Sequence, residues 1–444
     1  MSKWWLPRIW AAGLLLLITF SHPLWFGGPA NIDSVLTAPL FSYPANSAKW
    51  STWLTTITIL VACASVLFGS RYSRTMWWVI TASLVFSFLL NQHRLQPWAY
   101  QSAIYAAVFA SMSVAQAKRW LVMIAASIYL YSGIGKIDFQ FVHTVGQDFL
   151  NAVWFPGIGR FADQFDAPTM VRLAYALPIS EALVAIALLI PWSRRTAGLC
   201  AIGMHLSLLA ILGPWNLDHS AGVLCWNVLL VAQAWFLFVC PSLELEADSE
   251  KMAPEGETQR PHPVASRFSM AIVIVAVVMP LGERFGYWDH WTSWALYSPH
   301  TSRVEIEIHE SAIDRLPVEI VPFLSDVDGD HWNKLDLSRW SISHLNVPIY
   351  PQSRYQLTIA NRLANQFELR DAIRVFVKGV SDRRTGRREV QSLLGQRAIN
   401  ERFRQNASRR LSETMACHPR VLFRQKPLNV IGVLANPTTN FKTR

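Results

Sequence analysis

The chain has 444 residues, of which 52% are hydrophobic and only 16% are charged, whereas a typical soluble protein has about 25% charged residues. This composition excludes a disordered chain, a coiled coil and an ordinary soluble enzyme, and the length suggests two structural units. The net charge of +10 is concentrated at the C-terminal end, because the chain from Arg284 onward holds 24 basic and 16 acidic residues.

Nine apolar runs are long enough, alone or with flanking residues, to cross a bilayer as helices, which takes about 20 residues. They are residues 9–26, 50–68, 76–90, 97–115, 120–134, 173–192, 197–212, 220–240 and 268–281. The first run follows two basic residues, as in a signal peptide, but it has no clean small-residue cleavage site, so we interpret it as an anchor. The sequence therefore predicts eight transmembrane helices in residues 1–241, a solvated linker in 242–267 and a ninth helix in 268–283.

The basic residues of the connections predict the orientation of these helices. They gather in every second connection, at Lys3 and Arg8, Arg71 and Arg74, Lys118 and Arg119, Arg194 and Arg195, and Lys251, Arg260 and Arg267. Connections rich in Lys and Arg face the cytoplasm. We therefore expect a multi-pass protein of the cell (inner) membrane, with a cytoplasmic N-terminus and an extracytoplasmic C-terminal domain.

Residues 284–444 have the patterns of a small, basic α+β domain. Val304, Ile306 and Ile308 alternate with polar residues, which indicates a half-buried strand. Residues 372–380 predict a second strand, and residues 355–367 and 390–403 predict helices. Asp328-Gly329 predicts a turn, and we interpret the acidic residues around it as part of that turn because their spacing does not fit an EF-hand loop. The fold class is thus a helical membrane bundle followed by an extracytoplasmic α+β domain.

Three ionisable residues in or next to the apolar runs are candidates for a functional role. Lys136 follows the fifth run, and Glu181 and His205 lie within the sixth and seventh. Such residues in a membrane span usually face the bundle interior or a polar cavity. Lys136 is either an interfacial anchor or a desolvated amine that acts as a base. Glu181 and His205 either form one mutual hydrogen bond that clamps the two helices or handle protons in a cavity.

A short connection between the third and fourth runs is rich in polar and aromatic residues. It includes His93 and Trp98, and its Pro97 suits the first position of the next helix. The connection is either a hydrogen-bonded turn or the mouth of a site shared with Lys136 on the same side of the membrane. The five cysteines form no CxxC pair, so we expect no zinc site, disulfide framework or other metal centre.

One segment resembles a known family. The sequence YLYSGIGKIDFQFVHTVGQDFLNAVWFP, which contains Lys136, resembles a segment of vitamin K-dependent gamma-carboxylase and its bacterial relatives, the HTTM-domain proteins. MHLSLLAILGPW resembles a family helix with a histidine at the place of His205, and WTSWALYSPHTSRVEIEIHE resembles the entry into the family's lumenal β domain. The carboxylase has two adjacent lysines where this chain has Gly135 and Lys136. SGIGK and PISEALVAIALL also resemble DoxX/MauE-type membrane proteins.

The resemblance implies that Lys136 is the base that deprotonates a hydroquinone, with Glu181 and His205 as further catalytic residues. It suggests Tyr131, His93 and Trp98 as residues that contact the quinone. We expect quinol-linked redox or carboxylase-like chemistry at the outer face of the membrane. Alternatively, the chain is a non-enzymatic DoxX/MauE-like partner of an electron-transfer or protein-maturation system, or an anchor for its basic domain. The expected partners are the bilayer, a quinone and a protein in the membrane or periplasm, and not nucleic acid.

Overall fold

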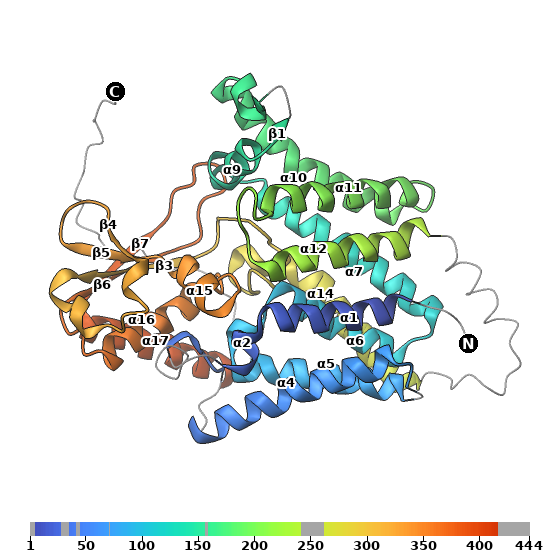
Figure 1. Ribbon diagram of the computed structural model, residues 1–444, viewed down its shortest axis with the longest axis horizontal. Helices are drawn as coiled ribbons and strands as arrows, with labels where there is room; N and C mark the ends of the chain where they lie inside the picture. Colours follow the sequence, from blue (N-terminus) through green and yellow to red (C-terminus); the bar gives the residue numbers. More distant parts are fainter. Residues whose placement is uncertain are drawn as a thin grey trace, which may run out of the picture. The chain divides into compact units, whose positions relative to one another are not determined.

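The computed structural model describes residues 5–27, 35–40, 45–70, 72–155, 159–240 and 262–415. The protein is mostly helical (Figure 1). The helices of the first three hundred residues are α1 (Leu6–Phe20), α2 (His22–Phe26), α4 (Ala45–Leu67), α5 (Ser73–Leu90), α6 (Pro97–Ser111), α7 (Val114–Lys136), α8 (Phe139–His143), α9 (Val145–Asn151), α10 (Ala167–Leu189), α11 (Arg194–Leu212), α12 (Ala221–Ala234) and α14 (Pro263–Val278).

Three shorter helical elements also belong to this region. A 3-10 turn, η1 (Gln92–Arg94), precedes α6. A π-helical turn, η3 (Trp235–Val239), extends α12, and a 3-10 helix, η4 (Met279–Phe285), extends α14. A two-stranded hairpin, β1 (Trp154–Phe155) and β2 (Gly159–Arg160), lies between α9 and α10.

The structure confirms a set of apolar helices that can cross a membrane. Within the described residues six helices are long and apolar enough, and a seventh is counted if α7 and the pair α8–α9, which bend by 70° at their junction, form one span. Two of the nine predicted spans are not among these helices, because α1 and α6 each have only 15 residues. Almost every residue of α6 is buried, so this helix is an interior element of the bundle.

The C-terminal region is a five-stranded antiparallel sheet with three helices. Its strands are β3 (Arg303–His309), β4 (Leu324–Asp326), β5 (Trp332–Leu335), β6 (Ile373–Lys378) and β7 (Val390–Leu394), in the order β4-β5-β3-β6-β7. Its helices are α15 (Leu337–Leu345), α16 (Ser353–Gln366) and α17 (Gly395–Met415). The predicted strand at 304–308 is confirmed as the central strand, with alternate residues buried.

Three further sequence predictions for this region can be compared with the structure. The strand predicted over 372–380 is β6, and the turn at Asp328-Gly329 joins β4 to β5, with Gly329 at a φ of +69°. The helix predicted over 390–403 is wrong in its first five residues. Residues 390–394 form strand β7, which pairs with β6 at the edge of the sheet, and the helix begins only at Gly395.

The sheet and the helical bundle belong to one compact unit, Met1–Phe403. His93 of η1 connects them: its Nε2 donates to the carbonyl of Pro348 (2.9 Å), and its Nδ1 lies 2.8 Å from the hydroxyl of Tyr355. The backbone amide of Phe139 donates to the carbonyl of Arg383 in the β6–β7 loop (2.8 Å). The sheet region is therefore held at the end of the bundle where α5 and α7 finish (Figure 1).

The predicted linker at 242–267 falls largely outside the described residues. The ninth predicted helix is observed, but α14 begins at Pro263, five residues before the predicted start. A proline at the first helical position needs no partner for its missing N–H.

Candidate functional site

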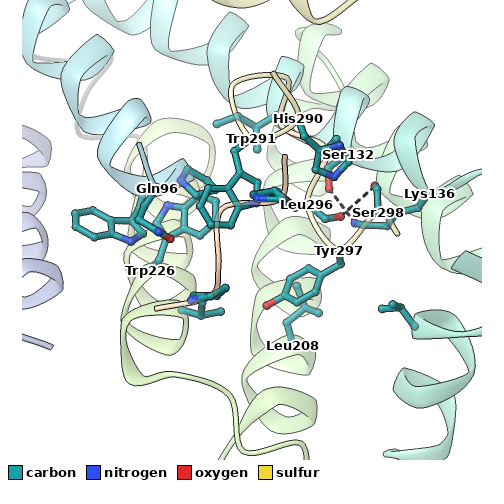
Figure 2. A pocket seen from close by; sticks show the side chains of 18 of the residues that line it. Gln96, Ser132, Lys136, Leu208, Trp226, His290, Trp291, Leu296, Tyr297 and Ser298 are labelled. Carbon is teal, nitrogen blue, oxygen red and sulfur yellow. Dashed lines mark hydrogen bonds between the residues drawn. The ribbon is translucent and has the colours of Figure 1, made fainter. Parts of the chain in front are cut away.

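A cavity of about 370 Å³ lies at the end of the bundle next to the sheet region. Its walls come from α7, α10, α11 and α12, from the start of α6 and the turn before it, from the segment between η4 and β3, and from residues of α15, α16 and the segment that joins them. Figure 2 shows Trp226 and Gln96 at one side of this cavity and Lys136 with Ser132 at the other. The wall is mostly apolar, with a few polar groups, as is usual for a site that binds a small organic molecule.

Lys136 enters the cavity from the last turn of α7. Its ammonium donates to the carboxylate of Glu181 (2.5 Å) and to the hydroxyl of Ser132 (2.8 Å), one turn earlier on the same helix. Lys136 is 8% exposed and Glu181 is 9% exposed. A buried charge is tolerated when it is paired and hydrogen-bonded, so the pair holds two charged groups inside an apolar region. The structure thus places Lys136 in the site and not at a lipid-facing anchor position.

Close packing of α7 on α10 sets this contact. Gly133 of α7 faces the backbone of α10, and a Cβ there would lie 2.8 Å from the carbonyl oxygen of Pro178. Gly135 faces the segment that follows η4, and a Cβ there would lie 2.9 Å from the hydroxyl of Ser298. The two glycines therefore let the end of α7 approach both neighbours, which brings Lys136 within reach of Glu181.

His205 forms a second polar group in the same cavity. The hydroxyl of Tyr129 donates to His205 Nε2 (2.8 Å), and His205 Nδ1 donates to the side-chain carbonyl of Asn227 (2.9 Å). The Asn227 amide in turn donates to the carbonyl of Val223. This network assigns a neutral ring with its proton on Nδ1, and both ring nitrogens are occupied.

The predicted hydrogen bond between Glu181 and His205 is therefore wrong. Glu181 pairs with Lys136, and His205 pairs with Tyr129 and Asn227, although all of them line the same cavity. The sequence prediction placed both residues facing the interior, but the rotation of each helix decides which groups meet. Tyr129 and Asn227 were missed because a tyrosine or an asparagine in an apolar run carries no charge to single it out.

The three residues predicted to contact a cofactor take different positions. Trp98 lines the cavity, as predicted for the connection before α6. Tyr131 points away toward α14, where its hydroxyl donates to the carbonyl of Val277 (2.7 Å). His93, in η1, is fully buried against α16 and is not part of the cavity wall. Burial lowers the pKa of His93 to about 4, so its ring is neutral at pH 7.

The cavity also has an aromatic wall that the sequence analysis did not identify. Tyr297 packs edge-on against Phe149 and His219, with ring centroids 5.4 and 5.7 Å apart. Its backbone has a φ of +56°, which is unusual for an aromatic residue. Burial raises the pKa of Tyr297 and lowers that of His219, so both are neutral at pH 7.

The arrangement offers one buried acid–base pair to a small ligand. Two of the three N–H groups of Lys136 donate to Glu181 and Ser132, and the third can donate to a ligand oxygen in the cavity. The aromatic rings of Trp98, Trp226 and Trp291 offer apolar faces to the rest of such a ligand. Comparison with protein-family models, with characterised proteins and with solved structures finds no match to this chain.

Proposed function

We propose that the protein is an integral membrane protein of the HTTM type, similar to vitamin K-dependent gamma-carboxylase, whose cavity binds a quinol and whose Lys136 removes a proton from it. The observation that carries this proposal is the convergence of the Lys136 and His205 segments. These are the two segments whose resemblance to the family is most specific, and both residues line one cavity.

The lining of the cavity supports a lipophilic aromatic ligand. Three tryptophans and Tyr297 contribute to its wall, and its polar groups include Lys136, Glu181 and His205. A quinol has the matching distribution, because it is an apolar ring with hydroxyl groups at its edge. The helices around the cavity are apolar enough to cross a membrane, which is where quinols dissolve.

The Lys136–Glu181 pair supports proton removal. In the resting pair Lys136 is an ammonium and Glu181 a carboxylate. If the proton moves within the 2.5 Å contact, Lys136 becomes a neutral amine and Glu181 a neutral acid. The amine then takes the proton of the quinol O–H. The products are a Lys136 ammonium, a protonated Glu181 and a quinol oxygen anion, so one proton has moved and no charge is lost.

The ammonium of Lys136 also stabilises the anion that it creates. In a low-dielectric cavity an opposite charge at hydrogen-bond distance is much more effective than in water. His205 has both nitrogens occupied, so we assign it to positioning: it fixes the hydroxyl of Tyr129, one turn from Ser132 on the same face of α7.

The charge pattern of the connections supports an extracytoplasmic location for the site. The basic residue Arg8 and the loop after α4 lie at one end of the bundle, where the guanidinium of Arg8 approaches Gly69. The cavity and the sheet region lie where α5 and α7 finish, the end with fewer basic connections. By the positive-inside rule we propose that this end faces outward in the cell membrane.

The experiment is the anaerobic titration of purified protein with a naphthoquinol, in which ionisation of the bound quinol is followed by its absorbance. Free phenols ionise near pH 10, so at pH 7.5 the bound quinol stays protonated unless the site favours its anion. We expect the anion with wild type and its loss in Lys136→Arg, because a guanidinium does not give up its proton. Arginine keeps the charge that Glu181 needs, so the variant can fold.

Lys118→Arg is the matched control, because it makes the same substitution near the opposite end of α7. Thermal melting of both variants verifies the fold. Equal ionisation in Lys136→Arg and wild type would contradict the role of Lys136 as base. Binding of quinol with no ionisation in wild type would instead favour the non-enzymatic DoxX/MauE-like partner.

A further inference from the structure

A second group of ionisable residues lies beside the cavity and has no part in the function proposed above. His290 Nδ1 is 2.8 Å from a carboxylate oxygen of Glu283, and His300 Nε2 is 3.0 Å from both oxygens of the same carboxylate. One ligand atom from each residue lies within 4.8 Å of the other two. The side chains of His300, His290 and Glu283 are only 0%, 3% and 11% exposed.

The chain takes an irregular path to bring these three residues together. Glu283 belongs to η4, and both histidines lie in the segment of turns between η4 and β3. Trp294 and Tyr297 of this segment have positive φ values of 58° and 56°. Such conformations are unfavourable for residues other than glycine, and they persist only where the surroundings enforce them.

The ion pairs of the residues around Glu283 allow its carboxylate to bind a cation. Arg284, the neighbouring residue, donates to Asp138 (3.0 Å). Within the described residues, the ion pairs and hydrogen bonds of the Glu283 side chain are with the two imidazoles. A buried carboxylate carries a negative charge that is costly in an apolar environment unless a cation pairs with it. A divalent cation bound to all three would compensate it.

The three donors are also the set that such cations prefer. Two imidazole nitrogens and one carboxylate oxygen are a common ligand set for Zn²⁺ and for non-haem Fe²⁺. At Zn–ligand bonds of about 2.0–2.1 Å, ligand atoms in a tetrahedral site lie roughly 3.3 Å apart. The nitrogen–oxygen distances of 2.8 and 3.0 Å therefore need to open by only a few tenths of an ångström.

We propose that Glu283, His290 and His300 bind one divalent first-row transition-metal ion in the wall of the cavity. This differs from the sequence analysis, which expected no metal centre in this chain. The His290 ring is part of the cavity wall and is labelled in Figure 2 beside Ser132. The backbone carbonyl of His300 accepts from the amide of Ser381 (2.9 Å), so the ion would also fasten the segment after η4 to the sheet.

The site has a specific mechanical consequence for the cavity. Ser298 and Ala295, between the two histidines, are the residues that pack against Gly135 next to Lys136. A metal ion that fixes His290 and His300 would hold this stretch against the end of α7. The inference does not depend on the quinol, since a metal ion can bind whether or not the cavity takes an organic ligand.

The experiment is metal analysis of the full-length protein, purified in detergent without a histidine tag, after incubation with Zn²⁺ or Co²⁺. We expect about one ion per chain in wild type and at least tenfold less in Glu283→Gln. The Co²⁺ form should show visible absorption of a nitrogen- and oxygen-ligated ion. Glutamine keeps the shape and an acceptor oxygen for the two imidazoles, so a cluster held by hydrogen bonds alone would survive this substitution.

Glu310→Gln is the control, because Glu310 forms an exposed pair with His331 (2.9 Å), and in the part of the chain that the structure describes this pair is not part of a group of three metal-ligating residues. This variant should bind as much metal as wild type. A chelator should lower the melting temperature of wild type and of Glu310→Gln but leave Glu283→Gln unchanged. The proposal is overturned if wild type takes up no metal, or if Glu283→Gln takes up as much as wild type, which would indicate a hydrogen-bonded cluster only.

Discussion

Lys136 and Glu181 are two buried ionisable side chains, and the contribution of each to stability depends on the presence of the other. Neither is more than 9% exposed, and they meet at 2.5 Å. A buried pair of this kind is often worth little compared with well-packed apolar residues, but the loss of one partner leaves an uncompensated charge. Each side chain therefore supplies the opposite charge that the other needs in this apolar region.

The first prediction concerns this coupling. Lys136→Met and Glu181→Leu should each destabilise the protein by roughly 3–5 kcal/mol, because each leaves the other charge buried and alone. The double variant should lose much less stability than the sum of the losses in the two single variants. The measurement is a double-mutant cycle from thermal unfolding in detergent at neutral pH. Additive losses would mean that the two side chains do not interact.

His93 gives a prediction for pH. Its pKa is lowered to about 4 in the folded protein by burial, whereas a histidine in the unfolded chain titrates near 6.5. Below pH 6.5 the unfolded chain therefore binds a proton that the folded protein does not, and stability falls as the pH decreases toward 4. The loss from this group is on the order of 3 kcal/mol.

The check is the melting temperature of wild type and of His93→Gln between pH 7.5 and 4.5. The variant should lose less stability over this interval than wild type, because glutamine has no proton to gain. Curves that stay parallel across the whole interval would show that His93 is already exposed or charged in the folded protein.

At the scale of elements, the contact between α7 and α10 positions the site. Gly133 lies against the backbone of α10, where a Cβ would be 2.8 Å from Pro178 O and 3.0 Å from Ala182 N. A backbone cannot move aside as a side chain can, so any larger residue must push the helices apart. Lys136 and Glu181 would then separate, because they lie on these same two helices.

Gly133→Ala should therefore lower stability by about 1–3 kcal/mol and weaken quinol binding. Gly203→Ala in α11 is the matched control, since a Cβ there meets nothing within 4 Å and alanine favours a helix by up to about 1 kcal/mol. Melting temperatures of the two variants provide the comparison. If both glycines tolerate alanine equally, the close approach of α7 and α10 is not as described.

An element could be predicted when its own residues carried a recognisable pattern, and not when its structure depended on pairing with a distant segment. β3 was predicted from its alternation, which is contained in a few residues, and the helix predicted over 355–367 is observed as α16. β7 was mistaken for the start of a helix because its identity as a strand comes from pairing with β6, which residues 390–394 do not encode by themselves. α6 is mostly apolar, and hydrophobicity alone does not distinguish a helix buried inside the bundle from one that faces lipid.

At the scale of the whole molecule, the orientation in the membrane can be tested directly. Asp328, in the β4–β5 turn, and Thr196, in the first turn of α11, are both exposed. Relative to the parent chain, Asp328→Cys should react with an impermeant thiol reagent added to intact spheroplasts, and Thr196→Cys should react only after lysis. The reverse pattern would overturn the proposed orientation. Ser381 would be a poor probe position because it is buried.

The site shows a similar division between what the sequence could and could not predict. Lys136, Glu181 and His205 were identified because a charged or titratable group in an apolar run is conspicuous. Their partners depend on helix rotation, which hydrophobicity alone does not determine. The group of Glu283, His290 and His300 was missed because its members lie in an irregular segment with no regular spacing.

The central claim is that the cavity beside Lys136 holds a quinol, and mass spectrometry of lipids extracted from the purified protein tests it most directly. Leu208 lines this cavity, whereas Leu206 on the same helix is exposed, so Leu208→Trp should fill the space and Leu206→Trp should not. We predict up to about one quinone per chain in wild type and in Leu206→Trp, and a severalfold loss in Leu208→Trp. Equal quinone in all three proteins, or none in wild type after supplementation with quinone, would contradict the claim.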